Sequence, residues 1–287
     1  MYFYIFDAGK DREVKNFERI QGRLLNLLAE HHIEGETYRV TSIRTVELLV
    51  DQAIGLEAKT VIVVGSDSTL NRTINSLVRK NVDITVGFIS LDSSSRLGQI
   101  FGITADIDQS VRSLAGRLVA ELDIGEINEH YFLSKVELGE NQFSQIERGF
   151  LGLTAMRKFL NLKPFVLNLR LEDSYNVSTE VLAAQIINCR NNEGCKMKLG
   201  NPTDRLLDIL LLNKLSATQI IRYRRDLEGR CFDNLPGATI MHAKKIEVLG
   251  PRKLPLAIEG QVYTKAPAMV KIAKQKIKMI VGKPRQF

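Results

Sequence analysis

The residues with the clearest chemical potential lie in one short loop, Gly65-Ser66-Asp67-Ser68-Thr69. The apolar run Val61–Val64 before this loop predicts a buried strand, and the residues after it have the apolar spacing of a helix. The first amides of a helix have no partner inside the helix, so a small-residue loop at this place could bind a phosphate. Asp67 adds a carboxylate that could hold a metal ion or polarise a nucleotide.

The same loop has a second interpretation. Asp67 and Ser68 are residue types that cap helix N-termini, so the segment could be an ordinary turn between a strand and a helix. Spacing alone leaves both interpretations open, because short motifs also occur by chance.

The elements around the loop predict the layer architecture of residues 1–122. Apolar runs indicating strands alternate with stretches of helical spacing, a pattern typical of a parallel sheet covered on both faces. Ligands bind such sheets at the carboxyl ends of the strands, and the loop after Val64 lies at such an end. The predicted strands are Tyr2–Phe6, Glu36–Val40, Thr60–Val64 and Ile84–Ile89, and the predicted helices cover Val14–Leu28, Val46–Ile54 and Val111–Leu122.

Beyond residue 123 most of the pattern indicates strands, which predicts a second, antiparallel sandwich-like domain at 123–267. A chain of 287 residues has room for about two domains. Helical spacing remains at Gly149–Leu160 and Ala217–Arg224. The predicted strands are Ile124–Leu138, Phe165–Leu171, Val181–Cys189, Ile240–Leu249 and Leu254–Tyr263.

The loop at Gly65 resembles the Gly-Gly-Asp-Gly-Thr loop of diacylglycerol kinase and sphingosine kinase type lipid kinases, which are related to NAD kinases and phosphofructokinases. The family's next residues are echoed by Leu70, Asn71, Ile74, Asn75 and Leu77. Three positions depart from the family, because Ser66 and Ser68 replace glycines and Arg72 replaces a glutamate. Glycine allows close approach to a phosphate and tolerates positive φ, so serines there could weaken or shift phosphate binding.

Two other loops resemble the family in position more than in residues. Ser90–Arg96 stands where the lipid kinases have a second nucleotide-contacting loop, with Ser93 and Ser95 in place of its threonine and asparagine. The alternative is a serine-rich polar turn. The turn Asp7-Ala8-Gly9-Lys10 occupies the place of the family's Asn-Pro-x-Ser-Gly but lacks the spacing of a P-loop.

Two acidic residues in the second half are assigned roles by the resemblance. Asp204 matches a position that can hold a structural metal in the family, although it could also simply open a turn. Glu259 precedes Gly260 as the family's candidate base precedes a glycine, and would accept the proton of the lipid hydroxyl; most Glu-Gly pairs are hairpin turns. The family's chain order also implies that the segment 268–287 completes the first domain.

The resemblance implies an ATP- and Mg²⁺-dependent kinase that phosphorylates a lipid hydroxyl, in an active or attenuated form. Asp67 and Glu259 would be the catalytic residues. The alternative is a catalytically inactive relative that binds ATP, ADP or lipid as a regulator. A NAD kinase is disfavoured, no nucleic acid is expected, and a homodimer is one option for the oligomeric state. The implied nucleotide-binding residues are Gly65, Ser66, Asp67, Ser68, Thr69, Asn71, Ser93 and Ser95.

The charge is concentrated near the C-terminus. The chain has 40 basic and 33 acidic residues, and its last 23 residues hold seven basic and no acidic side chains. A cationic segment attracts anionic membranes, here through Lys271, Lys274, Lys276 and Lys278. The alternation in this segment favours an edge strand whose lysines prevent association, and such a strand could still face a membrane. A cytoplasmic protein is expected, with peripheral membrane contact as an option.

The cysteines and histidines do not indicate a metal or disulfide site. Cys189, Cys195 and Cys231 are odd in number and lack metal-binding spacing, so neither a zinc site nor a disulfide framework is expected. The four histidines form no ligand pattern.

Overall fold

The fold was obtained as a computed structural model that describes residues 1–9, 14–139, 163–228, 231–258 and 261–287. The chain divides into two compact units, which are described separately. Unit 1 consists of Met1–Asp123 and Lys274–Gln286, and unit 2 consists of Ile124–Ala273 with Phe287. The strands β5 (Val119–Ile127) and β16 (Ala268–Ile280) each contribute residues to both units.

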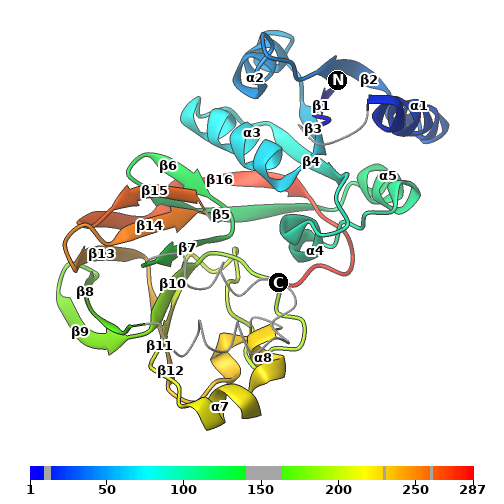
Figure 1. The fold of residues 1–287 in the computed structure, drawn as a ribbon. Helices are drawn as coiled ribbons and strands as arrows, with labels where there is room; N and C mark the ends of the chain where they lie inside the picture. The colour runs from blue at the N-terminus through cyan, green and yellow to red at the C-terminus, as the bar shows by residue number, and fades with distance from the viewer. Residues whose placement is uncertain (10–13, 140–162, 229–230, 259–260) are drawn as a thin grey trace. The chain divides into compact units, whose positions relative to one another are not determined.

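Unit 1 is built on a parallel sheet with the strand order β2-β1-β3-β4. Its strands are β1 (Tyr2–Phe6), β2 (Gly35–Arg39), β3 (Thr60–Gly65) and β4 (Thr85–Ser90). Figure 1 shows helices on both sides of these strands. On one side lie α1 (Val14–Glu30) and α5 (Ile107–Gly116), and on the other lie α2 (Val46–Gly55) and α3 (Asp67–Arg79). The short helix α4 (Arg96–Phe101) follows β4.

The helices are held by apolar faces of the kind predicted from the sequence. One cluster joins Phe17 and Leu24 of α1 with Leu114 of α5 over Ile62 and Val64 of β3, and all five side chains are buried. Burial on this scale is the main stabilising contribution to such a unit. Both faces of the sheet are covered, as expected for a parallel sheet.

One predicted helix is shorter than expected. Leu114, Leu118 and Leu122 have helical spacing, but α5 ends at Gly116 and Arg117 takes a left-handed conformation with φ of 47°. The chain then enters β5, in which Leu122 is buried as a strand residue while Leu118 is 43 % exposed. The prediction of a helix through Leu122 was therefore wrong, because a few apolar residues can fit both periods.

Unit 2 contains antiparallel strands in two sheets. In the first sheet, β13 (Lys245–Gly250) lies between β16 and β8 (Phe165–Leu171). The strand β9 (Tyr175–Val181) pairs with β8, and β5 forms a hairpin with β6 (His130–Phe132). The other sheet has the order β12-β11-β10-β7-β14-β15. Its strands are β7 (Lys135–Leu138), β10 (Ala183–Ile187), β11 (Leu207–Leu212), β12 (Ala238–Ala243), β14 (Pro255–Ile258) and β15 (Gln261–Lys265).

The inner faces of these two sheets share one core. Leu167 and Leu169 of β8 are buried in the same cluster as Ile186 of β10 and Ile209 of β11. A core of this kind is that of a β-sandwich. The outer face of the six-stranded sheet carries a second cluster, which includes residues near α7 (Ala217–Arg222), α8 (Arg224–Glu228) and the short helix η1 (Phe232–Asn234). The predicted parallel α/β region followed by an antiparallel sandwich is confirmed. The helix predicted at Gly149–Leu160 lies outside the described residues.

The C-terminal strand β16 is not an edge strand. It pairs with β4, β5 and β13, so the interpretation of its lysines as protection for an edge was wrong. Three of them instead form ion pairs: Lys271 with Glu126, Lys276 with Asp123 and Lys278 with Asp83, at 3.1, 3.4 and 2.6 Å.

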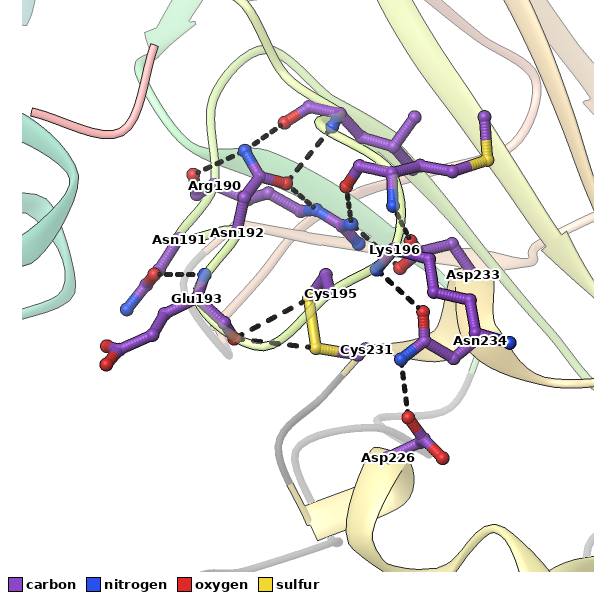
Figure 2. Close-up of a disulfide and its surroundings, with 12 residues drawn as sticks. Arg190, Asn191, Asn192, Glu193, Cys195, Lys196, Asp226, Cys231, Asp233 and Asn234 are labelled. Carbon is purple, nitrogen blue, oxygen red and sulfur yellow. Dashed lines mark hydrogen bonds and ion pairs between the residues drawn. A yellow bond between two sulfur atoms is a disulfide. The ribbon is translucent and has the colours of Figure 1, made fainter.

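The cysteines also differ from expectation, because Cys195 and Cys231 form a disulfide and Cys189 remains a buried free thiol. Figure 2 shows this bond beside an ion pair of Arg190 with Asp233, whose side chains lie 2.7 Å apart and are almost fully buried. An odd number of cysteines without a recognisable spacing gave no basis for a pairing, and only the fold brings these two segments together.

Candidate functional site

Three loops meet at the carboxyl ends of adjacent strands in unit 1. Phe6 of β1 is paired with Val64 of β3, and Gly65 of β3 with Ser90 of β4. The residues that follow these positions, in the turn at Asp7, the loop at Ser66 and the serine-rich loop from Leu91, therefore start side by side. This is the edge at which doubly wound sheets bind their ligands.

The carboxylate of Asp67 joins two of the loops. Its Oδ1 accepts a hydrogen bond from the Ser95 hydroxyl at 2.5 Å, and its Oδ2 accepts from the backbone amides of Arg96 and Leu97 at 2.9 and 3.2 Å. These amides lie in the first turn of α4, where Ser95 is the N-cap. Asp67 is therefore a second, long-range cap for α4, and a carboxylate is favoured there by the exposed amides and the helix dipole. Two residues predicted to bind nucleotide, Asp67 and Ser95, are thus in direct contact.

The serines that replace the family's glycines are compatible with the local backbone. Ser66 is the N-cap of α3 with φ of −97°, and its hydroxyl accepts the Thr69 amide at 3.3 Å. Ser68 lies in the first turn of α3. Neither position uses the left-handed conformation that favours glycine. Both side chains are exposed, so their hydroxyls extend the polar surface of the loop.

Gly65 is favoured by the close approach of the neighbouring turn. A Cβ at Gly65 would lie 3.2 Å from both Cβ and the carbonyl oxygen of Asp7. Asp7 also accepts a hydrogen bond from the Thr69 hydroxyl at 2.7 Å, and its other oxygen accepts the Gly9 amide at 2.9 Å. Thr69 is buried, with 2 % exposure. The hydroxyl of Thr69 thus connects this loop to the turn at Asp7, and its role in nucleotide binding stays a prediction.

Asp7 is the residue of this site that sequence analysis did not select. The family has asparagine at its place, and the predicted site did not include the turn. The available signal was an acidic residue directly after a predicted strand, at the edge where the other two loops also begin.

The other predicted nucleotide residues lie near this edge with different exposures. Ser93 is exposed and Ser95 is buried at 6 %, so only Ser93 presents its side chain to solvent. Asp92 organises the loop between β4 and α4, because its Oδ1 accepts the amide and the hydroxyl of Ser94 at 2.8 Å. Asn71 is half-buried in the second turn of α3, and its carbonyl accepts the Asn75 amide group at 2.9 Å.

Arg72, which replaces the family's glutamate, points its charge toward α2. Its guanidinium makes two hydrogen bonds to the Glu47 carboxylate, at 3.0 and 2.8 Å. The hydrogen bond from Arg72 is the main cause that lowers the pKa of Glu47 from 4.5 to about 2. Because the fork geometry of Arg matches a carboxylate, this cation is committed to a neighbouring helix.

The element predicted to hold a metal forms a tight turn in unit 2. Asp204 is exposed and accepts the Leu206 amide at 2.9 Å, and Arg205 has a left-handed φ of 64°. Four residues on, Asp208 is buried and accepts the Gly200 amide and Nδ1 of His242, both at 2.5 Å. Across the described ranges, no three His, Cys, Asp or Glu side chains gather as a metal group. The metal role of Asp204 stays a prediction.

Glu259, the predicted base, lies outside the described residues together with Gly260. Its role stays a prediction. The candidate site that the structure describes therefore consists of the three loops at the carboxyl ends of β1, β3 and β4 in unit 1.

Comparison with known proteins shows what this chain is similar to. Residues 6–127 match the family model of the diacylglycerol kinase catalytic domain. The chain is 21 % identical over 273 residues to a diacylglycerol kinase of Bacillus subtilis (strain 168), a match that covers 90 % of this chain and 88 % of that relative. The resemblance predicted from the loops is confirmed, because residues 6–127 are similar to the diacylglycerol kinase catalytic domain.

Solved structures show the same fold along almost the whole chain. A diacylglycerol kinase from Bacillus anthracis str. Sterne superposes with a TM-score of 0.77 at 12 % identity, covering 99 % of this chain and 97 % of that one. A putative diacylglycerol kinase from the same organism gives 0.79 at 15 % identity, covering 98 % and 97 %. An NAD kinase from Archaeoglobus fulgidus in complex with ATP gives 0.57 at 13 % identity, covering 99 % and 95 %. At these identities the likeness establishes the fold.

Proposed function

We propose that this chain is a diacylglycerol kinase-like lipid kinase that binds ATP at the three loops of unit 1 and phosphorylates a lipid hydroxyl with attenuated activity. The observation that supports this proposal most is the bridge formed by Asp67 between the loop after β3 and the start of α4. It holds together two of the loops that the family resemblance assigns to nucleotide binding. Phosphoryl transfer depends mainly on positioning and electrostatics, so a preorganised pair of loops is a relevant feature.

The phosphate would bind at the N-terminus of α3. The Thr69 amide is satisfied by the Ser66 hydroxyl, which leaves the amides of Asp67 and Ser68 as donors that a phosphate oxygen could accept. The helix dipole favours an anion at this end. The exposed hydroxyl of Ser68 adds a donor that the family's glycine lacks, whereas the Ser66 hydroxyl donates to Oγ1 of Thr69 at 3.0 Å.

Asp67 acts in this proposal as a positioning residue. A carboxylate offers about four acceptor sites, and three protein donors already use the oxygens of Asp67. The described side chains thus do not fit a dedicated protein site for Mg²⁺, which commonly binds through one or two carboxylates together with substrate phosphates. A requirement for Mg²⁺ therefore remains to be tested with the nucleotide.

The second candidate function is that of an inactive relative that binds nucleotide or lipid as a regulator. Two observations favour it. Arg72 is engaged by Glu47, so its charge is not directed at the phosphate loop. The carboxylate of Asp67 is engaged by α4, which leaves it little capacity for other ligands.

The membrane and dimer predictions belong to the same proposal. Lys271, Lys276 and Lys278 are ion-paired, whereas Lys274 is exposed. Pairing reduces the attraction of this segment to anionic lipid, so a contribution well below the usual value of about 1 kcal/mol per lysine is expected. Among the described helices, none combines the length and apolarity needed to cross a bilayer. A homodimer stays an untested option.

Calorimetric titration with Mg·ATP and transfer of labelled phosphate to diacylglycerol in phosphatidylcholine vesicles separate the two functions. Binding with transfer supports the kinase, and binding without transfer supports the regulator. An absence of binding at millimolar Mg·ATP contradicts the kinase and leaves only a lipid-binding regulator. We expect Asp67→Asn and Glu259→Gln each to abolish transfer. The control is Asp106→Asn, which alters a carboxylate cap of the same kind at α5. Transfer retained in both test variants would refute the residue assignments.

A further inference from the structure

Unit 1 has an open cavity at the edge of its parallel sheet opposite to the three loops. The cavity has a volume of about 390 Å³, which lies in the range of small-molecule binding sites. Its lining comes from the end of α3, the segment 81–84 before β4, the stretch 275–278 of β16 and Glu121 of β5. All of these residues belong to unit 1.

The cavity lies at the far ends of two elements whose other ends carry the candidate site. The helix α3 begins at the loop after β3 and ends at Arg79, and β4 runs from Thr85, next to the cavity, to Ser90. A helix of 13 residues is about 20 Å long. A ligand in the cavity therefore cannot touch a phosphate at the N-terminus of α3, and the cavity is a separate site.

Part of the lining is aliphatic. Val78 of α3, Ile84 before β4 and Ile277 of β16 line the cavity and are otherwise buried. Val82 is half-buried and lines it as well. Removing methylene groups from water against such a wall is favourable. The cavity can therefore accept a short carbon chain.

The polar part of the lining contains two lysines whose charges are already compensated. Nζ of Lys278 lies 2.6 Å from Oδ2 of Asp83, and Nζ of Lys276 lies 3.4 Å from Oδ1 of the buried Asp123. The hydrogen bond to Asp83 is the main cause that raises the pKa of Lys278, and the charge of Glu121 adds to it. Both lysines thus have carboxylate partners and little attraction left for an added anion.

Glu121 carries the excess charge of the cavity. It is exposed, and with the residues that the structure describes it forms no ion pair. Three carboxylates, those of Asp83, Glu121 and Asp123, stand against two ammonium groups, which leaves one negative charge. The C-terminus of α3 adds the negative end of a helix dipole. The electrostatics therefore favour a cation.

The residues present favour an organic cation over a metal ion. In the described ranges no three His, Cys, Asp or Glu side chains are grouped so that they could hold a metal. An ammonium group needs only a carboxylate and a few hydrogen-bond acceptors. The side-chain amides of Asn81 and Gln275, which also line the cavity, provide such acceptors.

We propose that this cavity binds a small aliphatic amine. Its ammonium group pairs with Glu121, and its carbon chain lies against Val82 and Ile84. The amine is a ligand distinct from ATP and from the phosphorylated substrate, because it binds at the opposite edge of the sheet from the three loops. This inference goes beyond the proposed kinase and does not depend on it.

The test is a calorimetric titration of the full chain with butylamine, 1-butanol and butyrate. These probes place a cation, a neutral group and an anion on similar short carbon chains. Glu121→Gln removes the charge with little change in volume, and Val82→Phe fills the cavity. The matched control is Glu36→Gln, which removes an exposed carboxylate from β2 at the other end of the parallel strand order. Thermal unfolding checks that each variant is folded.

Butylamine should bind with a Kd of about 1 mM, as expected for a ligand of so few atoms, and added salt should weaken its binding. 1-Butanol should bind about fivefold more weakly, because it lacks the ion pair, and butyrate should not bind. Glu121→Gln should weaken butylamine about fivefold and leave 1-butanol unchanged. Val82→Phe should weaken both, and Glu36→Gln should change neither.

Equal affinities for butylamine and 1-butanol would refute the preference for a cation, and tighter binding of butyrate would assign the cavity to anions. No saturation by butylamine at about 50 mM would refute the site. Binding that is unchanged in both Glu121→Gln and Val82→Phe would place the amine elsewhere. Should Val82→Phe fail to fold, the comparison of Glu121→Gln with Glu36→Gln still decides. A chain that binds butylamine but no Mg·ATP would refute the kinase and retain this site.

Discussion

The lipid kinases that this chain resembles have glycines at the places of Ser66, in the loop after β3, and of Arg205, in the turn before β11. In the first, Ser66 takes φ of −97° and uses its hydroxyl to cap α3. In the second, Arg205 takes φ of 64°, a conformation in which a Cβ is strained. The same kind of substitution is accommodated in one region and strained in the other. The effect of losing a glycine therefore depends on the backbone conformation at its position.

The two regions are also held together by different interactions. The loop after β3 is connected to its neighbours by hydrogen bonds from Asp67 and Asp7. The turn at Arg205 lies between Cys195 and Cys231, inside the chain segment closed by the disulfide. A covalent link can hold a strained turn, and its removal is the largest perturbation expected in either region.

Replacement of Cys195 by serine should lower the free energy of unfolding of unit 2 by up to about 4 kcal/mol. The bond joins positions separated by 36 residues, and closing a loop of that length reduces the entropy of the unfolded chain by about this amount. Urea unfolding followed by far-UV circular dichroism, with and without a reductant, measures the change.

The reduced protein should still fold, because Arg190 and Asp233 connect the same segments through a buried ion pair. The Lys196 amide also donates to Asn234 at 2.8 Å (Figure 2). Cys189→Ala serves as the control, since Cys189 forms no disulfide and its replacement should leave the response to reductant intact. Identical urea midpoints with and without reductant would show that the bond does not contribute.

Arg205→Gly should stabilise unit 2 by about 1 kcal/mol, because glycine adopts positive φ without the steric cost of a Cβ. The effect is reported by the urea midpoint. Arg205→Ala keeps the Cβ and removes the guanidinium, so it should give no such gain. If glycine and alanine raised the stability equally, the gain would come from removing the arginine side chain. The backbone at position 205 would then not be strained, and it would no longer differ from Ser66 in this respect.

Local patterns in the sequence predicted the elements better than the contacts between them. The strand Phe165–Leu171 has the bounds expected from its alternation. The family resemblance also assigned the loops at Asp67 and Ser95 to one nucleotide site. It could not predict that Asp67 would cap α4, since that contact joins positions 28 residues apart in a geometry set by the loops.

The predictions that the structure contradicts failed for a common physical reason. Leu118 and Leu122 fit a helix in spacing, yet the chain leaves α5 at Arg117. Cys195 and Cys231 come from segments that only the tertiary fold brings together. The lysines of β16 were counted as a cationic segment because their partners, such as Asp83 and Asp123, are distant in sequence. In each case a long-range contact decided the outcome.

The third departure from the family in unit 1 is the replacement of a glutamate by Arg72, and its ion pair with Glu47 can be tested by pH. The pKa of Glu47 falls from 4.5 to about 2 in the folded protein, so the pair contributes stability above pH 4.5 that is lost as the pH falls toward 2. The two side chains are 44 % and 49 % exposed, which limits the contribution to about 0.5 kcal/mol.

Glu47→Gln should therefore reduce stability at pH 7 and have less effect at pH 3, as measured by urea midpoints at the two pH values. The control is Asp51→Asn on the same helix, which removes a single contact to Lys80 at 2.6 Å. A difference between wild type and Glu47→Gln that grows as the pH falls would contradict the assigned pKa direction.

Ser66→Gly should give the smallest effect and the opposite sign to Arg205→Gly. Glycine gains nothing at φ of −97° and loses the hydroxyl that caps Thr69, so unit 1 should lose a few tenths of a kcal/mol. Ser68→Gly, one residue into α3, provides the matched control for flexibility without a cap. If Ser66→Gly instead stabilised the protein, the serine would be strained like Arg205. The loop after β3 would then no longer be a region in which the backbone accommodates the replacement of glycine without strain.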